Sequence, residues 1–343
     1  MPGTIDDHFH LSEEQRQFFL EHGFVKIPGC FSRETAEAYT STIWTRLGAS
    51  PTDKSTWPTQ KLNMPGHTLV KVEDFAPKAY DAICDVIGGE DRWTDWCKDW
   101  KDGFIVNFGS PDMTPDMDLD VRTLDNWHND GDWFTHFLDS PEQALLVIPL
   151  FSDIKPKGGG TVICTDGIKL VAQELYDHPD GMTPFMMPRG TPEIPKENPE
   201  RRKVWNSWVQ NPELTRGETF HEATGEVGDV YLLHPFMLHS ASRNLLRNVR
   251  IITNPPVALK EPFNYNRKDP SEYSLVEQKT LRDLGRPEGL PEWKITAPRE
   301  RITPARVGMQ AELKRKEMER LKAQGLAVNN IAGARVLEGQ YPS

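Results

Sequence analysis

The sequence predicts an antiparallel β-sandwich or β-barrel wrapped by helices. Short strand-like segments dominate the middle of the chain and helical patterns stand at both ends, an order typical of such folds. No strand leads into a G-x-G-x-x-G or Walker loop, so a nucleotide-binding parallel sheet has no support. With 343 residues, 37% of them hydrophobic, the chain can bury a sizeable core as one large domain or two modest ones.

The N-terminal region is predicted to form a helix, a strand and a second helix. Residues 11–22 and 32–48 have Ser12 and Ser32 as the expected N-caps, and each segment ends at a glycine. Between them, the alternating segment GFVKIPG predicts a short strand.

The middle of the chain alternates loops and strands. Residues 49–66 are rich in Pro, Thr and Ser and predict a loop, whereas residues 75–100 predict a tryptophan-rich helix. Residues 110–125 predict an acidic loop. Apolar runs bounded by turn residues predict strands within 102–109, 143–153, 158–167, 225–244 and 249–259.

A long segment, residues 176–226, interrupts this β region with many prolines and little periodicity. A stretch of this length inside a compact domain is usually functional or disordered. Its apolar side chains hint at an apolar or polycyclic ligand, although core packing explains them equally well: Met182, Met186, Met187, Trp205 and Trp208. Residues 311–326 predict a charged terminal helix, either solvated with i,i+4 ion pairs or packed on a partner subunit in a homodimer.

Charge and cysteine usage exclude several classes of protein. The net charge of -11 disfavours binding to nucleic acid or to anionic membranes, because phosphates repel an acidic surface. The main basic run before the tail, residues 196–203, is predicted to be a solvated loop. The four cysteines form no CxxC pair, and no signal-like or membrane-spanning apolar run is present. We therefore expect a cytoplasmic protein without disulfides.

The segment NWHNDGDWF, residues 126–134, places His128 and Asp130 two residues apart. On a strand, residues i and i+2 project from one face, so both side chains would point into the same cavity. An imidazole and a carboxylate are two of the three ligands in the facial triad of non-haem Fe(II), which leaves the opposite positions open. The same pattern also fits a polar edge strand without a metal.

The third ligand must come from a distant strand. His239 ends the apolar segment GDVYLLHPFMLH and is the better candidate. His234 lies five residues earlier and faces the opposite way on a regular strand, although Pro235 can break that regularity. His234 is interpreted as a structural histidine, but periodicity alone leaves it open as a ligand.

Arg250 opens the apolar strand that follows a polar bend. A buried guanidinium needs a carboxylate partner, because an unpaired buried charge is very costly. The distal carboxylate of 2-oxoglutarate is such a partner, since the planar guanidinium binds a carboxylate through two hydrogen bonds. A structural salt bridge is the alternative interpretation. Arg243 and Arg247 lie in the bend and are expected to be solvated.

Three segments, taken in order, resemble the phytanoyl-CoA dioxygenase family of Fe(II)/2-oxoglutarate oxygenases. They are LSEEQRQFFLEHGFVKIPGCFS, WHNDGDW and GEVGDVYLLHPFMLHSASRN with a later arginine. In that family the arginine follows the distal histidine by 11 residues, and this spacing to Arg250 selects His239 over His234. The resemblance covers roughly residues 11–260.

The resemblance implies a mainly β fold with flanking helices around a double-stranded β-helix core of the jelly-roll, cupin-like type. The expected organisation is one dioxygenase domain with core strands at about 102–260 and a lid at about 176–226, followed by a helix and tail: residues 1–310 and 311–343. The chain departs from the family at GGGTVICTDGI and in the long insertion, so the family's substrates do not transfer to it.

The resemblance also implies roles for individual residues. Iron would be held by His128, Asp130 and His239, and Arg250 would anchor the distal carboxylate of 2-oxoglutarate. Further hydrogen bonds to 2-oxoglutarate are expected from Asn107, Ser240 and Ser242. The substrate pocket would be walled by Trp127, Trp133 and Phe134, which are equally compatible with plain core packing.

The expected activity is an Fe(II)- and 2-oxoglutarate-dependent dioxygenase that oxidises an unactivated C–H bond of a small molecule, usually by hydroxylation, with release of succinate and CO2. Ascorbate is the expected reductant in assays, and secondary metabolism is the expected setting. Desaturation or rearrangement would use the same ligands. The alternatives are a catalytically silent metal- or ligand-binding relative, and a zinc hydrolase that needs neither O2 nor Arg250.

Overall fold

The N-terminal elements of the computed structural model follow the predicted order. α1 (Glu13–His22) begins with a capping box at Ser12 and ends at Gly23, which adopts the left-handed conformation with φ 72°. β1 (Phe24–Ile27) follows directly. The structure describes residues 8–57, 61–192, 194–195, 198–304, 306–327 and 333–336.

The predicted helix at 32–48 is divided into two. α2 (Arg33–Thr40) has the predicted serine cap, and α3 (Ile43–Leu47) ends at the predicted glycine. At the end of α2, the hydroxyl of Thr40 donates a hydrogen bond of 2.8 Å to the carbonyl of Ala36. Side-chain bonds of this kind compete with the helical ladder and bend helices, and the break follows at once.

The predictions for 49–66 and 75–100 are partly wrong. The predicted loop contains η1 (Lys54–Thr56) and β2 (Lys61–Asn63). The predicted helix ends at two consecutive glycines with positive φ, Gly88 and Gly89, because such backbone conformations cannot continue a helix. The elements of this region are β3 (Thr68–Lys71), α4 (Val72–Phe75), α5 (Pro77–Ile87), η2 (Glu90–Arg92), η3 (Asp95–Cys97) and β4 (Asp99–Lys101).

The larger sheet of the core runs in the order β2-β5-β11-β6-β9-β1, and every pairing in it is antiparallel. β11 and β6 are joined where the amide of Phe151 donates to the carbonyl of Ile251 at 2.9 Å. The strands not yet defined are β5 (Ile105–Asn107), β6 (Leu145–Pro149), β9 (Val230–Leu233), β11 (Arg250–Ile252) and its continuation β12 (Pro256–Val257).

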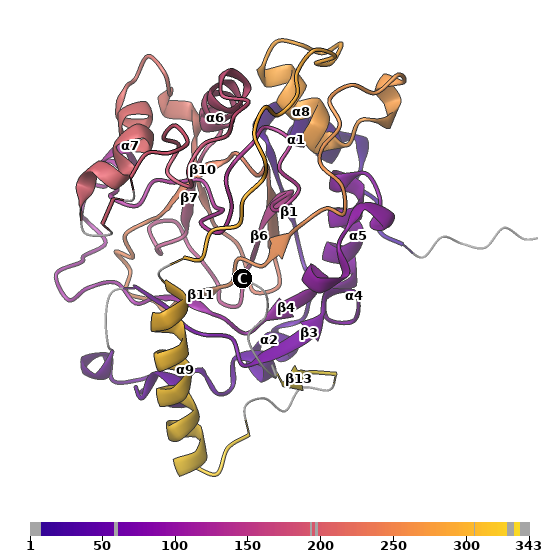
Figure 1. Ribbon diagram of the computed structural model, residues 1–343. Coiled ribbons are helices and arrows are strands. Elements are labelled where there is room, and N and C mark those ends of the chain that lie inside the picture. Colours follow the sequence, from indigo (N-terminus) through magenta and orange to yellow (C-terminus); the bar gives the residue numbers. More distant parts are fainter. Residues whose placement is uncertain are drawn as a thin grey trace, which may run out of the picture.

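The smaller sheet consists of β10 (Leu238–Ala241), β7 (Thr161–Cys164) and β8 (Phe220–Ala223). The segment around His128 joins its edge through paired backbone hydrogen bonds to His239, of 3.0 and 2.9 Å. From β5 onward, with the segment around His128 counted, the chain alternates between the larger and the smaller sheet, except that β7 and β8 are consecutive strands of the smaller sheet. This crossing between two sheets is typical of a jelly roll. The predicted double-stranded β-helix core with antiparallel strands is therefore confirmed (Figure 1).

The region 158–226 contains more regular structure than predicted. α6 (Asp166–Asp177) follows β7, and the insertion itself carries η5 (Pro199–Arg202), α7 (Lys203–Gln210) and η6 (Gly217–Thr219). Its last residues form β8 and belong to the smaller sheet, so the segment outside the core is shorter than 176–226. The predicted acidic loop at 110–125 holds only η4 (Val121–Thr123).

Helices cover the sheets on several sides. α8 (Leu275–Asp283), which the sequence did not predict, packs against α1, α5 and α6. A strap of residues 284–304 then runs down to the terminal helix (Figure 1). Within the described part of the chain, no helix is both long and apolar enough to cross a membrane.

The terminal helix α9 (Arg306–Ala323) begins earlier than predicted and packs on α3. It is not only a solvated helix, because Glu317 is buried against the guanidinium of Arg46 at 2.8 Å and the ring of His67 at 2.8 Å. Asp102 also pairs with Arg46 at 3.0 Å. β13 (Arg335–Val336) follows and pairs with β3. Much of the predicted tail, residues 328–332 and 337–343, lies outside the described residues.

Candidate metal centre

His128 and His239 lie directly opposite each other on neighbouring antiparallel strands, and their ring centroids are 4.2 Å apart. Paired residues on adjacent strands project from the same face. The strand alternation that places His128 on this face also places Asp130 there. The structure thus brings the three predicted ligands together from two segments that are about a hundred residues apart in the chain.

The ligand atoms of these three residues converge on one point. Oδ1 of Asp130 lies 3.4 Å from Nε2 of His128 and 3.7 Å from Nε2 of His239. One ligand atom from each residue fits within 4.8 Å of the others, and no other cluster of this kind occurs in the described ranges. Two imidazoles and one carboxylate are the ligand set that suits Fe(II), with open positions on the opposite side.

Each histidine ring is fixed by a backbone carbonyl two residues before it. Nδ1 of His128 lies 2.7 Å from the carbonyl of Asn126, and Nδ1 of His239 lies 3.1 Å from that of Met237. Since a carbonyl only accepts, both Nδ1 atoms carry the proton and both Nε2 lone pairs face the cluster. Hydrogen bonds of this kind set the tautomer and orientation of metal-binding histidines.

The protonation states suit a cation. Burial and the neighbouring His128 together lower the pKa of His239 to about 4, so the ring is neutral at pH 7. Burial raises the pKa of Asp130, but the two histidines and a 3.4 Å hydrogen bond from the amide of Asn254 outweigh this, and the pKa lies below its ordinary value. The cluster therefore offers the neutral imidazole of His239 and the carboxylate of Asp130, and the hydrogen bond at Nδ1 of His128 leaves its Nε2 facing them.

His234 lies away from the cluster. Its ring is fully buried in the corner between β9 and β10, and Nε2 lies 2.9 Å from the hydroxyl of Thr280 on α8. The corner HPFM separates two strands that the sequence suggested as one. His234 thus joins a helix to the sheet, as its structural interpretation expects.

Arg250 lies in one row with two other polar residues across the larger sheet. It is paired with Asn107, which is in turn paired with Lys61, so all three side chains project from one face. Arg250 is almost fully buried, and its Nε donates to the carbonyl of Gly159 at 2.9 Å. No carboxylate in the described residues lies within 4.0 Å of its guanidinium.

Gly159 allows this row to form. Its φ is 79°, and a Cβ there would lie 2.7 Å from the amide nitrogen of Asn107 and 2.7 Å from Cβ of Asn244. Its carbonyl accepts hydrogen bonds from both Arg250 and Asn107. The glycine turn GGG that precedes β7 is therefore required for the close approach of the backbone to these side chains.

A cavity of about 730 Å³ opens beside Lys61 and Asn107 of this row, and Asn126, two residues before His128, also lines it. Neither Arg250 nor the three predicted metal ligands are among its described lining residues. Its other polar lining residues include Arg202, Arg243, Asp112, Asp125 and Ser242. The hydroxyl of Ser242 is buried and has no hydrogen-bond partner in the described structure. Ser240 is also buried, but strand alternation turns its side chain to the face opposite His239.

The sequence analysis did not single out Lys61, and it placed Arg202 in the basic run 196–203, which was predicted to be a solvated loop. That prediction is wrong for Arg202, because residues 199–203 are helical and Arg202 lines the cavity. Burial and the charges of Arg250 and Arg202 together lower the pKa of Lys61 to about 8. The only sequence signal was a lysine within an otherwise polar loop, which is too common to identify a site. Both residues become visible only when β2 and the insertion are placed beside β5.

The predicted aromatic residues lie around the metal strand. Trp127 is fully buried and projects away from the metal face, where it packs on Phe220 with ring centroids 5.6 Å apart. Trp133 and Phe134 contact each other edge to face at 5.2 Å. Ile302 of the strap donates to the carbonyl of Trp133 at 2.7 Å, so the strap runs along this segment.

The insertion also reaches the metal strand. Trp205 of α7 is buried, its Nε1 donates to the side chain of Asn129 at 2.9 Å, and its ring lies 6.4 Å from that of His128. Met182 and Met186 are buried too, whereas Met187 and Trp208 are only partly so. These side chains belong largely to the core, and Trp205 is the one in ring contact with a predicted ligand.

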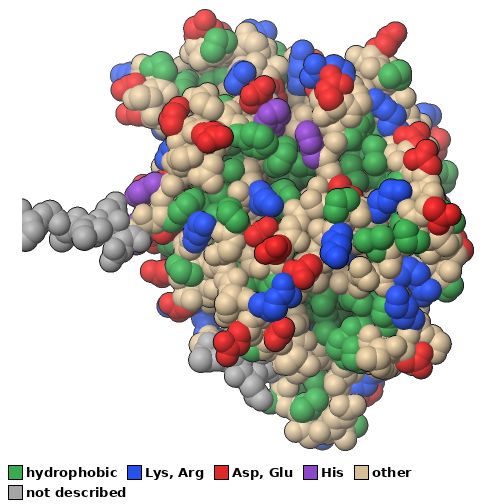
Figure 2. All heavy atoms as spheres, turned by 180° about the vertical axis from the view of Figure 1, so that it is seen from behind, with side chains coloured by type: hydrophobic (Ala, Val, Ile, Leu, Met, Phe, Trp, Pro, Cys, Tyr) green, Lys and Arg blue, Asp and Glu red, His purple; other side chains and the backbone are tan. Residues whose placement is uncertain are grey.

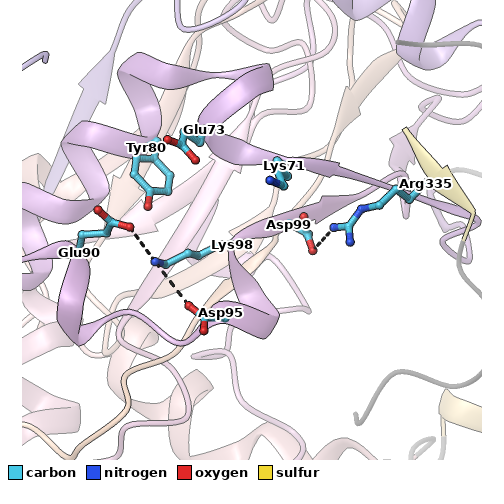
Figure 3. Close-up of a pocket in the computed structure, with 8 residues that line it drawn as sticks. All are labelled: Lys71, Glu73, Tyr80, Glu90, Asp95, Lys98, Asp99 and Arg335. Carbon is cyan, nitrogen blue, oxygen red and sulfur yellow. Dashed lines mark hydrogen bonds and ion pairs between the residues drawn. The ribbon is translucent and has the colours of Figure 1, made fainter. Parts of the chain in front are cut away.

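A second pocket lies elsewhere, between α5, η3 and β4, and has a volume of about 280 Å³. Its charges pair with one another: Lys98 lies 3.0 Å from Glu90 and 3.6 Å from Asp95 (Figure 3). The face shown in Figure 2 likewise carries interspersed acidic and basic side chains. We find no chemistry in this second pocket that resembles the metal cluster.

Comparisons with known proteins give structural neighbours only. No family model and no curated protein matches the chain. HygX from Streptomyces hygroscopicus with nickel and 2-oxoglutarate is 12% identical over 73% of this chain and 88% of its own, with a TM-score of 0.38. The carbocyclase SnoK from nogalamycin biosynthesis is 17% identical over 85% and 97%, with a TM-score of 0.39. EctD from S. alaskensis with 2-oxoglutarate and 5-hydroxyectoine is 13% identical over 75% and 77%, with a TM-score of 0.39.

Proposed function

We propose that the protein is an Fe(II)- and 2-oxoglutarate-dependent dioxygenase that oxidises a C–H bond of a small molecule, with hydroxylation as the default outcome. One observation carries the proposal: the ligand atoms of His128, Asp130 and His239 converge, and both histidines turn Nε2 toward the carboxylate. On the larger sheet, the buried guanidinium of Arg250 has no carboxylate within 4.0 Å among the described residues.

The ligand set fits iron better than it fits a structural metal. Three protein ligands on one side leave room for a bidentate keto acid and O2, whereas structural zinc sites are closed by four protein ligands. A carboxylate among the ligands also favours Fe(II) over softer metals. Asn254 holds the second oxygen of Asp130, so a single oxygen faces the metal position.

The cavity beside the cluster fits the rest of a dicarboxylic keto acid. Arg250 would bind the distal carboxylate through charge-assisted hydrogen bonds. The unpartnered hydroxyl of Ser242 is available as a further donor, and Asn107 fixes the wall of the cavity through its bonds to Gly159 and Ser242. Asn107 would therefore act mainly by positioning, and Ser240 would support β10 from its other face.

Iron and 2-oxoglutarate together supply the oxidising power, with succinate and CO2 as the products of the co-substrate. The protein holds the small-molecule substrate next to the metal and excludes water. In this proposal, Trp205 of the insertion, whose ring contacts that of His128, and the strap beside Trp133 and Phe134 would do this.

The proposal is tested by anaerobic addition of 2-oxoglutarate to the Fe(II)-loaded protein. We expect a visible charge-transfer band, followed on exposure to O2 with ascorbate by slow succinate release that a true substrate accelerates. His178→Ala, a change to a surface histidine, is the matched control for His128→Ala. Metal binding without the band or succinate would indicate a catalytically silent relative, and O2-independent turnover would indicate a hydrolase.

A further inference from the structure

The insertion places a guanidinium in the cavity beside the metal cluster. Arg202, the last residue of η5, lines this cavity together with Lys61. Its Nη1 donates to the carbonyl of Trp127 at 3.3 Å, so the side chain reaches the strand that carries His128. Arg202 is therefore in contact with the site although it comes from a segment outside the jelly-roll core.

Lys61 and Arg202 line this part of the cavity, and Arg250 lies in the same row of side chains as Lys61. The charges of Arg250 and Arg202 both lower the pKa of Lys61. In the parts of the chain that the structure describes, none of the three has a carboxylate within 4.0 Å; Asp125, which also lines the cavity, and Glu222 act on them from farther away. Like charges in a partly buried site repel one another, and an anion between them relieves this repulsion.

A second contact fixes where Arg202 lies. One turn along the chain, Trp205 donates a 2.9 Å hydrogen bond to the side chain of Asn129. Arg202 and Trp205 therefore hold the residues on either side of His128. This docking keeps the Arg202 side chain directed along the metal strand and into the cavity.

We propose that Arg202 is a second binding residue for the distal carboxylate of the keto-acid co-substrate, so that the insertion closes over the co-substrate and not only over the organic substrate. The proposal rests on the function proposed above. Arg250 would bind the carboxylate from the sheet and Arg202 from the insertion, and a single anion would join these two parts of the chain.

The test compares two ligands of the Ni(II)-loaded protein. N-Oxalylglycine chelates the metal and carries a distal carboxylate, whereas oxalate chelates the metal without one. We expect Arg202→Gln to lower the affinity for N-oxalylglycine by about tenfold, the usual effect of losing one charge-assisted hydrogen bond. The affinity for oxalate should stay unchanged. Arg201→Gln is the matched control, because Arg201 lies over the ring of Phe185 at 4.0 Å and does not line the cavity.

The two ligands separate a binding role from a structural one. The proposal would be overturned if Arg202→Gln lost affinity equally for N-oxalylglycine and oxalate. It would also be overturned if the Arg201 and Arg202 variants bound N-oxalylglycine with equal affinity. Arg202→Lys keeps the charge and should restore most of the affinity. Cleavage of the insertion by trypsin should slow when N-oxalylglycine binds to the wild type, and less so in Arg202→Gln. If even the wild type fails to bind Ni(II) or oxalate, the proposed function itself is wrong.

Discussion

The metal cluster and the neighbouring cavity differ in how the chain assembles them. The two histidines are fixed locally, each by the carbonyl two residues earlier, and a short backbone pairing brings them together. The cations in and beside the cavity come from remote segments: Lys61 from β2, Arg202 from the insertion, and Arg250 from β11, in the same row as Lys61. A site fixed locally tolerates changes elsewhere, whereas a site assembled from remote segments depends on how each of them docks.

The largest effect is expected at the cluster. His128→Ala or Asp130→Ala removes one of three ligands, and we expect turnover to be abolished and Fe(II) affinity to fall by more than about a hundredfold, beyond the loss typical of residues that only support a ligand. Metal titration and succinate release measure both effects. Persistent turnover with an unchanged circular dichroism spectrum would show that the ligands are assigned wrongly.

The next effect concerns the cavity and should leave the cluster intact. Arg250→Ala should raise the 2-oxoglutarate concentration required by about ten- to a hundredfold, because a charge-assisted pair is lost, while the affinity for Fe(II) stays unchanged. The change in the 2-oxoglutarate requirement, compared with the change in Fe(II) affinity, measures how independently the cavity and the metal cluster bind their ligands. An unaltered 2-oxoglutarate requirement would reassign this role to Arg202, which lines the cavity, whereas Arg247 lies over the ring of Trp57.

A smaller effect is expected from Asn254, which supports the cluster without binding the metal. Asn254→Ala removes the 3.4 Å hydrogen bond to Asp130 and should weaken Fe(II) binding by about tenfold, as for other residues that orient a ligand. Asn254→Asp tests the same position with a repelling charge and should be worse. Wild-type affinity in both variants would mean that backbone alone positions Asp130.

The smallest effect should depend on pH. The pKa of Lys61 is lowered to about 8, so its ammonium assists binding of an anion below that pH. Affinity for N-oxalylglycine should then fall several-fold as the pH rises through this value. Because the bound anion raises the pKa of Lys61, the complex should lose this proton at a higher pH than the free protein does. Lys61→Met should bind more weakly at low pH and lose this dependence. A wild-type pH profile in the variant would remove Lys61 from the site.

The sequence predicted the cluster better than the cavity for a physical reason. The i, i+2 alternation of His128 and Asp130 is a local property, so it survives any error in the surrounding elements. Local alternation did not identify His239 as the third ligand, because Pro235 makes the periodicity of its segment ambiguous. Only the spacing to Arg250 selected it. The split at residues 234–237 shows why: β9 and β10 belong to different sheets.

The sequence did not predict the cavity, because its walls depend on pairing between segments that are far apart in the chain. β2 has three residues inside a Pro- and Thr-rich stretch, and it is a strand because β5 offers an edge. Arg202 lies in a segment without periodicity, so its place could not be derived from the sequence. The terminal helix was predicted to be solvated. Its Glu317 is instead buried, because it bonds to His67 and Arg46, which lie 250 and 271 residues away in the sequence. The single domain over 1–310, the cytoplasmic location and a homodimer stay predictions.

The buried ion cluster around Arg46 has a consequence for biosynthesis. Arg46 is made early, but its partner Glu317 is translated 271 residues later. Until then a buried guanidinium has only Asp102 to offset it, and an incompletely paired charge is costly in an apolar interior. Nascent chains should therefore not reach their final packing until translation is nearly finished. Truncated products that lack α9 should be recognised by cellular proteases.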